Sequence, residues 1–262
     1  MKNILISNDD GILAPGILAL KQALEKIANV TVVAPQENNS GVGRSLSVFK
    51  PLNIKEYALE DGSKGYGVSG TPADSVDVGI NYVMDEKPDL VVTGINSGVN
   101  LSNDIVTTSG TICAAIESVS HGVPAIAVSL FIDEDSFSQD ESGEWYMDID
   151  FSSAQEVVIN LVEKVLDEGF PDNINLLNLN IPSKMLSDEL KVTKFADRML
   201  DHAVNDTKDD DGNDCIMIMP NLINEYDEDT DGYCLMVEKR PSLTPINLDF
   251  NGDRDKLDEW LK

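Results

Sequence analysis

Short apolar strands alternate with amphipathic helices along the first 182 residues, and this alternation constrains the fold more than any other feature. The segments NILIS (3–7) and NVTVVAP (29–35) are typical of buried strands, and PGILALKQALEKI (15–27) has apolar residues at helical spacing. The alternation continues with strand-like segments at 89–96, 124–130 and 173–182 and helix-like segments at 71–84, 109–122 and 152–169. Because parallel strands are joined by crossover helices, we predict an α/β fold with a mainly parallel sheet flanked by helices.

The pattern changes in the last third of the chain. The segments ELKVTKFAD (189–197), CIMIMP (215–220) and YCLMVEKRPSLTPINLDF (233–250) are strand-like and are separated by acidic loops. A few extended strands have little core of their own, so we expect this part to pack on a second subunit. We therefore divide the chain into a core at 1–182 and a β-rich C-terminal extension at 183–262 that serves oligomerisation.

The chain has 47 acidic and 19 basic residues, and its net charge of −28 narrows the choice of partners. Such a surface repels nucleic-acid polymers and anionic membranes, so we expect neither as a partner. Acidic residues gather at 133–150, 205–214 and 224–232, and we expect the first two segments to be solvated loops. The sequence begins with MKNILIS, without the features of a signal peptide, and its apolar runs are too short to cross a bilayer. We therefore predict a cytoplasmic protein.

Oxygen-bearing side chains follow three of the predicted strands. Asp9 and Asp10 come directly after the first strand, Ser40 follows the second, and Asn96 ends the strand at 89–96. In open α/β sheets, ligands bind at the carboxyl ends of the strands. Two carboxylates balance a divalent cation, and an all-oxygen ligand set suits magnesium or manganese. The alternative is that the two aspartates only form turns and helix caps.

A second feature is the start of the helix in SGTICAAIES. Ser109, Gly110 and Thr111 open this helix, and a helix start offers unpaired backbone N–H groups and the positive end of the helix dipole. Ordinary helix capping explains this tripeptide alone about as well. Because it follows the strand that ends in Asn96, we expect it to bind phosphate. Asn100, in the loop between them, orients either water or ribose, or only forms a turn.

Five motifs together resemble a known family. They are ISNDDGILAPG, VVAPQENNSGVGRS, VSGTPADSV, GINSGVN and SGTICAAIES, and they stand in the same order as in the SurE family, the stationary-phase survival proteins. The resemblance is dense over residues 1–130 and looser through LLNLNIP and EDTDGYCLMVEKRPSLTPI. The chain departs from the family pattern at Asn39, Ser102 and Thr108, which puts nucleobase preference and oligomer packing in doubt.

The resemblance implies a Rossmann-like catalytic core that hydrolyses nucleoside 5′-monophosphates, and often 3′-monophosphates, to nucleoside and phosphate. It implies one divalent metal ion per subunit, Mg²⁺ or Mn²⁺, held by Asp9, Asp10, Ser40 and Asn96. The phosphate-binding positions would be Gly41, Asn96, Ser109, Gly110 and Thr111. It further implies a homodimer or homotetramer. Asp9 or Asp10 could also act as the general base, and we favour Asp9.

Three other interpretations share these sequence features. A phosphoryl-accepting receiver domain also carries an acidic pair after its first strand, but it needs an aspartate where this chain has Asn96. A non-catalytic module that binds metal and nucleotide would share the same residues without turnover. A short-chain exopolyphosphatase would differ only in substrate. The sequence leaves the last two open.

Overall fold

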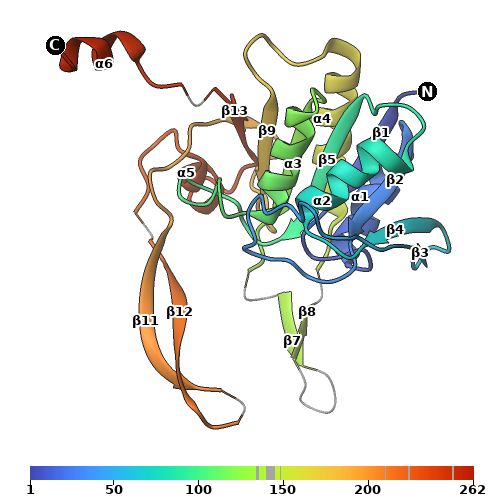
Figure 1. Cartoon of the computed structure of the whole chain (residues 1–262), viewed down its shortest axis with the longest axis horizontal. Coiled ribbons are helices and arrows are strands. Elements are labelled where there is room, and N and C mark those ends of the chain that lie inside the picture. The colour runs from blue at the N-terminus through green and yellow to red at the C-terminus, as the bar shows by residue number, and fades with distance from the viewer. Residues whose placement is uncertain (134–135, 140–144, 148, 210, 224, 250) are drawn as a thin grey trace.

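The structure is a computed structural model that describes residues 1–262 apart from 134–135, 140–144, 148, 210, 224 and 250. A nine-stranded sheet forms its centre (Figure 1). Its strand order is β10 (Lys191–Val192), β13 (Ser242–Ile246), β9 (Leu176–Ile181), β6 (Ala125–Leu130), β5 (Leu90–Ser97), β1 (Asn3–Ser7), β2 (Asn29–Pro35), β4 (Lys64–Val68) and β3 (Ile54–Ala58).

The sheet is mainly parallel, which confirms the predicted fold class. Each neighbouring pair from β9 through β6, β5, β1 and β2 to β4 is parallel. Strand β3 runs antiparallel to β4, and β13 runs antiparallel to β9, whereas β10 pairs with β13 in parallel. The sequence did not indicate β3 or β4, because Lys55, Glu56 and Ala58 of β3 are exposed at the sheet edge and β4 contains two glycines.

Helices cover both faces of the sheet. On one face α1 (Pro15–Leu24) packs against α4 (Ser152–Glu168), and on the other α2 (Pro72–Val78) packs against α3 (Gly110–Ser120). The predicted helix at 71–84 ends in a π-helical turn, η1 (Gly79–Val83). No helix in the described part of the chain is long and apolar enough to span a membrane.

The first strand shows how the sequence produces this layering. Ile4 and Ile6 belong to the hydrophobic cluster that includes α1 and α4, whereas Leu5 belongs to the cluster that includes α2 and α3. Successive side chains of a strand point to opposite faces, so a strand that is apolar throughout needs a cover on each side. All three side chains are fully buried, and burying each contributes roughly 1.5–3 kcal/mol to folding.

The C-terminal part adds strands to the central sheet and also forms a separate hairpin outside it. Strands β10 and β13 join the sheet beside β9, while β11 (Leu200–Lys208) and β12 (Asp214–Leu222) form a hairpin that projects away from the body (Figure 1). Helix α6 (Arg254–Trp260) lies at the end of the chain.

The predicted strand at 233–250 is wrong in its first half. Residues Asp231–Met236 form helix α5, and only Ser242–Ile246 are a strand. The Thr230 hydroxyl accepts a hydrogen bond from the backbone N–H of Tyr233 and so caps the helix at its start. The apolar residues of α5 were indistinguishable from a strand because the segment is short.

Two acidic segments predicted to be loops contain strands. Strand β11 runs to Lys208 and β12 begins at Asp214, so only residues 209–213 remain between them. The segment at 133–150 contains a short hairpin of β7 (Phe137–Gln139) and β8 (Trp145–Met147), and part of it lies outside the described residues. Polar residues form strands in β11 because the apolar segment of β12 pairs with them, a partner that local sequence does not reveal.

One buried carboxylate ties the C-terminal part to the core. Asp231 accepts hydrogen bonds from the backbone N–H groups of Ser102 (2.7 Å), Ala196 (2.8 Å) and Gly232 (2.8 Å). Burial raises the pKa of this carboxyl group, and the three N–H groups oppose that rise. Asp231 thus fixes the loop after β5 against the segments on either side of the projecting hairpin.

Candidate metal and phosphate site

The strand order creates a crevice beside the first strand. The chain passes from β1 to β2 on one side and returns to β5 on the other side of β1. Loops that leave two neighbouring strands in opposite directions open a crevice at their carboxyl ends, where ligands bind in such folds. Asp9 and Asp10 follow β1, and Asn96 is the residue before the last one of β5. The structure therefore brings these three predicted residues to one edge of the sheet.

A bulge in β5 shapes this edge. Thr93 pairs with Ala127 and Asn96 pairs with Ser129, so two residues of β5 oppose one residue of β6. Gly94 has φ +122°, and a Cβ there would lie 2.2 Å from a backbone oxygen, so only glycine fits. Bulges of this kind re-aim the end of a strand, which accounts for the displacement of Asn96 from regular pairing.

Asp9 is held in place from three sides. It is only 4% exposed, and its Oδ1 accepts a 2.6 Å hydrogen bond from the hydroxyl of Thr111. Its backbone oxygen accepts a 2.7 Å bond from the N–H of Asn39. A Cβ at Gly110 would lie 2.8 Å from Oδ2 of Asp9, so glycine lets helix α3 begin directly against the carboxylate. The first turn of α3 and the acidic pair therefore form one site.

Neither carboxylate of the pair is neutralised by the protein. Burial raises the pKa of Asp9 to about 6, and the charge of Asp10 adds to that rise. Burial also raises the pKa of Asp10, opposed by the Ser97 N–H, which donates to its Oδ2 at 3.3 Å. No cation contributes to either pKa. Two desolvated carboxylates without a counter-charge are unfavourable, and a cation between them would remove both penalties.

The remaining predicted ligands supply neutral oxygens. The side chain of Asn96 donates its Nδ2 hydrogen to the backbone oxygen of Gly98 at 3.0 Å, which leaves Oδ1 as an acceptor. Ser40 is exposed, and only its backbone N–H is bonded, to Asn38. Its neighbour Gly41 is exposed with φ +73°. The described residues contain no cluster of three or more Asp, Glu, His or Cys suited to a metal, so an ion here needs these neutral oxygens. The donor set fits Mg²⁺ or Mn²⁺.

The helix start offers a place for an anion. The Ser109 hydroxyl accepts the backbone N–H of Ile112 at 3.1 Å and caps α3, and the Thr111 hydroxyl is engaged with Asp9. The first N–H groups of a helix have no partner within it, so those at Gly110 and Thr111 remain for a ligand. Thr111 would thus contact phosphate through its backbone N–H while its hydroxyl holds Asp9. The N–H of Ser109 is bonded to the backbone oxygen of Ile105 at 2.9 Å, so Ser109 would contact phosphate through its hydroxyl proton.

Asn100 lies apart from the acidic pair in a buried polar network. Its Nδ2 donates to the Ser129 hydroxyl at 2.8 Å, and its backbone oxygen accepts from the side chains of Asn178 (2.8 Å) and Asn180 (3.0 Å). The side-chain amide of Asn100 thus donates to β6. A direct contact of Asn100 with substrate stays a prediction. The sequence analysis missed Asn178 and Asn180, although two asparagines in a fully buried strand were a signal that something polar lies against it.

Comparison with known proteins identifies the family. The family model for survival protein SurE matches residues 4–202. The chain belongs to the SurE family. It is 42% identical to "5′-nucleotidase SurE" of Methanobrevibacter smithii over 98% of this chain and 99% of the relative. It is 40% identical to the protein of the same name from Methanosphaera stadtmanae, over 99% of each.

The fold agrees with a solved structure of the same family. The crystal structure of the SurE protein from Aquifex aeolicus matches with a TM-score of 0.78 and 35% identity, covering 99% of this chain and 98% of that one. The predicted resemblance and the α/β architecture are therefore confirmed for this SurE-family chain.

The buried charge of Asp9 makes a prediction about the metal-free protein. Its folded-state pKa of about 6 lies above the ordinary value of 3.8, so this group destabilises the folded state increasingly as the pH rises from about 4 through 6. In EDTA, Asp9→Asn should therefore raise the melting temperature at pH 7.5 and have little effect at pH 4. A two-unit shift corresponds to at most about 3 kcal/mol. A lower melting temperature at pH 7.5 would show that Asp9 is a structural turn residue.

Proposed function

We propose that the chain is a metal-dependent phosphomonoesterase that hydrolyses nucleoside 5′-monophosphates, and also 3′-monophosphates, to nucleoside and phosphate. The observation that carries this proposal is the uncompensated acidic pair, buried Asp9 and half-buried Asp10, against the first turn of α3. Relatives that align over nearly the whole chain are named 5′-nucleotidase, which confirms the enzyme class at the level of the family. A phosphate ester is the ligand that such a combination of cation site and helix start would bind.

One divalent ion, Mg²⁺ or Mn²⁺, would be held by Asp9, Asp10, Ser40 and Asn96. When bound, such an ion polarises a phosphoryl oxygen and lowers the pKa of a bound water. The negative surface of the chain makes this ion more important, because a net charge of −28 repels a phosphate substrate unless a cation lies in the site.

The protein groups would divide the remaining work. Thr111 occupies Oδ1 of Asp9, which leaves Oδ2 to accept a proton from the attacking water. The N–H groups at the start of α3 and the side chain of Asn96 would face the charge that develops on the phosphoryl oxygens. Gly41 and Ser109 would border the phosphate, where the absence of a side chain at Gly41 leaves open space.

Phosphate release from adenosine 5′-monophosphate tests the proposal. EDTA should abolish release, and Mn²⁺ or Mg²⁺ should restore it. Adenosine 3′-monophosphate and tripolyphosphate, assayed in parallel, separate the nucleotidase from an exopolyphosphatase. Full activity after exhaustive chelation would contradict metal dependence, and no release from any of the three would leave only a binding module.

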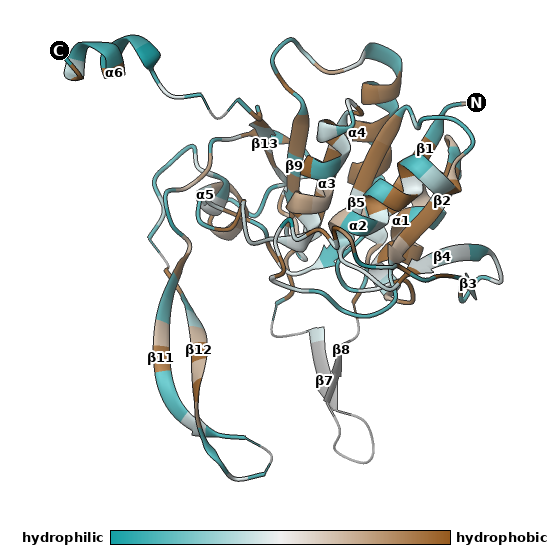
Figure 2. Ribbon diagram, in the orientation of Figure 1, coloured by the Kyte–Doolittle hydropathy of each residue, from teal (hydrophilic) through white to brown (hydrophobic). Residues whose placement is uncertain are grey.

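We also infer that residues 183–262 serve assembly into a homodimer or homotetramer. The projecting hairpin carries exposed apolar side chains along both strands, and Figure 2 shows hydrophobic segments on it far from the core. Ile216 and Ile218 are 67% and 64% exposed. An isolated two-stranded hairpin is marginally stable in water, so a partner surface that covers these side chains would stabilise it.

Light scattering tests this assembly. We expect the wild-type chain to be a dimer or larger at low micromolar concentration, more completely in high salt, because salt screens the repulsion between two chains of charge −28. The double variant Ile216→Ser and Ile218→Ser should shift the population towards the monomer, whereas Asn221→Ser, an exposed polar change on the same strand, should not. A wild-type monomer at every salt concentration would exclude the proposal.

A further inference from the structure

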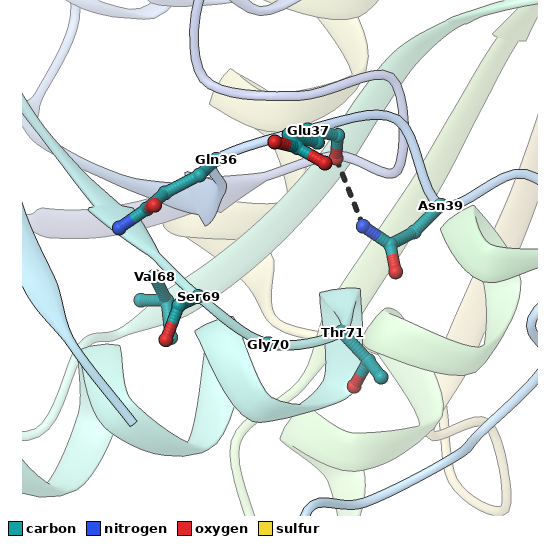
Figure 3. Close-up of a pocket in the computed structure, with 7 residues that line it drawn as sticks. All are labelled: Gln36, Glu37, Asn39, Val68, Ser69, Gly70 and Thr71. Carbon is teal, nitrogen blue, oxygen red and sulfur yellow. Dashed lines mark hydrogen bonds between the residues drawn. The ribbon is translucent and has the colours of Figure 1, made fainter. Parts of the chain in front are cut away.

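A polar cavity of about 340 Å³ lies beside the proposed metal site. Gln36, Glu37 and Asn39, from the loop after β2, line one side, and Ser69, Gly70 and Thr71, from the loop after β4, line the other (Figure 3). Its volume falls within the range of small-molecule sites. Apart from Asn39, a departure from the family pattern, none of these residues was singled out by the sequence.

Backbone contacts join this cavity to the acidic pair. The backbone N–H of Asn39 donates to the backbone oxygen of Asp9 at 2.7 Å. A Cβ at Gly11 would lie 3.3 Å from the backbone carbon of Glu37, so the two loops pack directly against each other. Ser40, a proposed metal ligand, is the next residue after Asn39. If the phosphate of a substrate lies at the metal, the group esterified to that phosphate would therefore reach this cavity.

The loop after β2 presents side-chain acceptors, and each of its two amide groups has committed one of its two N–H donors. Gln36 donates its amide hydrogen to the backbone oxygen of Gly67 at 3.2 Å, and Asn39 donates to the backbone oxygen of Glu37 at 2.9 Å. The amide oxygens of Gln36 and Asn39 and the exposed carboxylate of Glu37 are left as acceptors. No cation within the described chain pairs with Glu37.

The opposite wall of the cavity adds few free hydrogen-bond donors that could bind an anion. The Thr71 hydroxyl is occupied, because it donates to the backbone oxygen of Ser45 and accepts the N–H of Asp74. The Ser69 hydroxyl accepts the backbone N–H of Asn53, so only its own proton is available. The cavity therefore favours a ligand that supplies hydrogen-bond donors, and the negative charge of Glu37 disfavours a second phosphate.

We propose that this cavity binds the sugar of the substrate and that Glu37 accepts hydrogen bonds from the ribose hydroxyls. The proposal rests on the proposed function, since it places the sugar next to a phosphate held at Asp9 and Asp10. A vicinal diol offers two adjacent O–H donors, which matches a carboxylate flanked by amide oxygens. An acidic residue after an early strand has the same role in dinucleotide-binding α/β folds. The consequence is a preference for ribonucleotides over 2′-deoxyribonucleotides.

The test compares Glu37→Gln with wild type on three substrates in the presence of Mn²⁺. They are adenosine 5′-monophosphate, its 2′-deoxy analogue and p-nitrophenyl phosphate, which has no sugar. Wild type should prefer the ribonucleotide by about tenfold in kcat/KM, and Glu37→Gln should lose most of this preference, because a charged acceptor is replaced by a neutral one. Turnover of p-nitrophenyl phosphate should not change. Glu163→Gln, an exposed carboxylate on α4, controls for the change in net charge.

Binding of free adenosine and 2′-deoxyadenosine, measured by calorimetry, tests the cavity independently of turnover. A preference for adenosine that is lost in Glu37→Gln supports the proposal even if no substrate is hydrolysed, in which case only the proposed function fails. An equal loss of activity on all three substrates, an unchanged ribose preference in Glu37→Gln, or no ribose preference in wild type would each overturn the role of Glu37.

Discussion

The desolvation of two adjacent carboxylates, buried Asp9 and half-buried Asp10, is the constraint on which the site depends. Both have a pKa raised by burial, and among the described residues no cation compensates them. The fold nevertheless holds them in place through Thr111, the Ser97 N–H and the Asn39 N–H. A protein that keeps such a pair at the carboxyl end of its first strand gains a site for a divalent cation and loses stability when the cation is absent.

A second layer of buried polar groups supports the loop that leaves β5. Asn100 is bonded to Asn178 and Asn180 on β9, and Asp231 accepts the N–H of Ser102. The carboxylate of Asp104 accepts the backbone N–H groups of Met199 and Leu200, both at 3.3 Å, where the hairpin begins. The loop between Asn96 and the start of helix α3 is thus fastened to the C-terminal part. Packing of the hairpin on another subunit would therefore also restrain this loop.

Patterns of neighbouring residues were enough to predict the central sheet and the position of the acidic pair. The alternation of strands and helices predicted the parallel sheet. The rule that ligands bind at the carboxyl ends of strands placed Asp9 and Asn96 at the same edge of that sheet. What the sequence could not reveal depends on partners far along the chain. Strand β11 is acidic and forms only because β12 pairs with it, and Asp231 is buried only because three distant segments donate to it. Glu37 was missed because a single exposed carboxylate has no local signature until a cavity lies beside it.

The central claim is that the acidic pair exists to hold a divalent cation, and a calorimetric titration with Mn²⁺ tests it most directly. The measurement needs no substrate and no turnover. The wild-type chain should bind one Mn²⁺ per subunit, and Asp10→Asn should weaken binding by more than about tenfold, because one of the two balancing charges is lost. Glu163→Gln should bind as wild type does. Equal Mn²⁺ affinity in wild type and Asp10→Asn would contradict the claim and leave the two aspartates as elements of the scaffold.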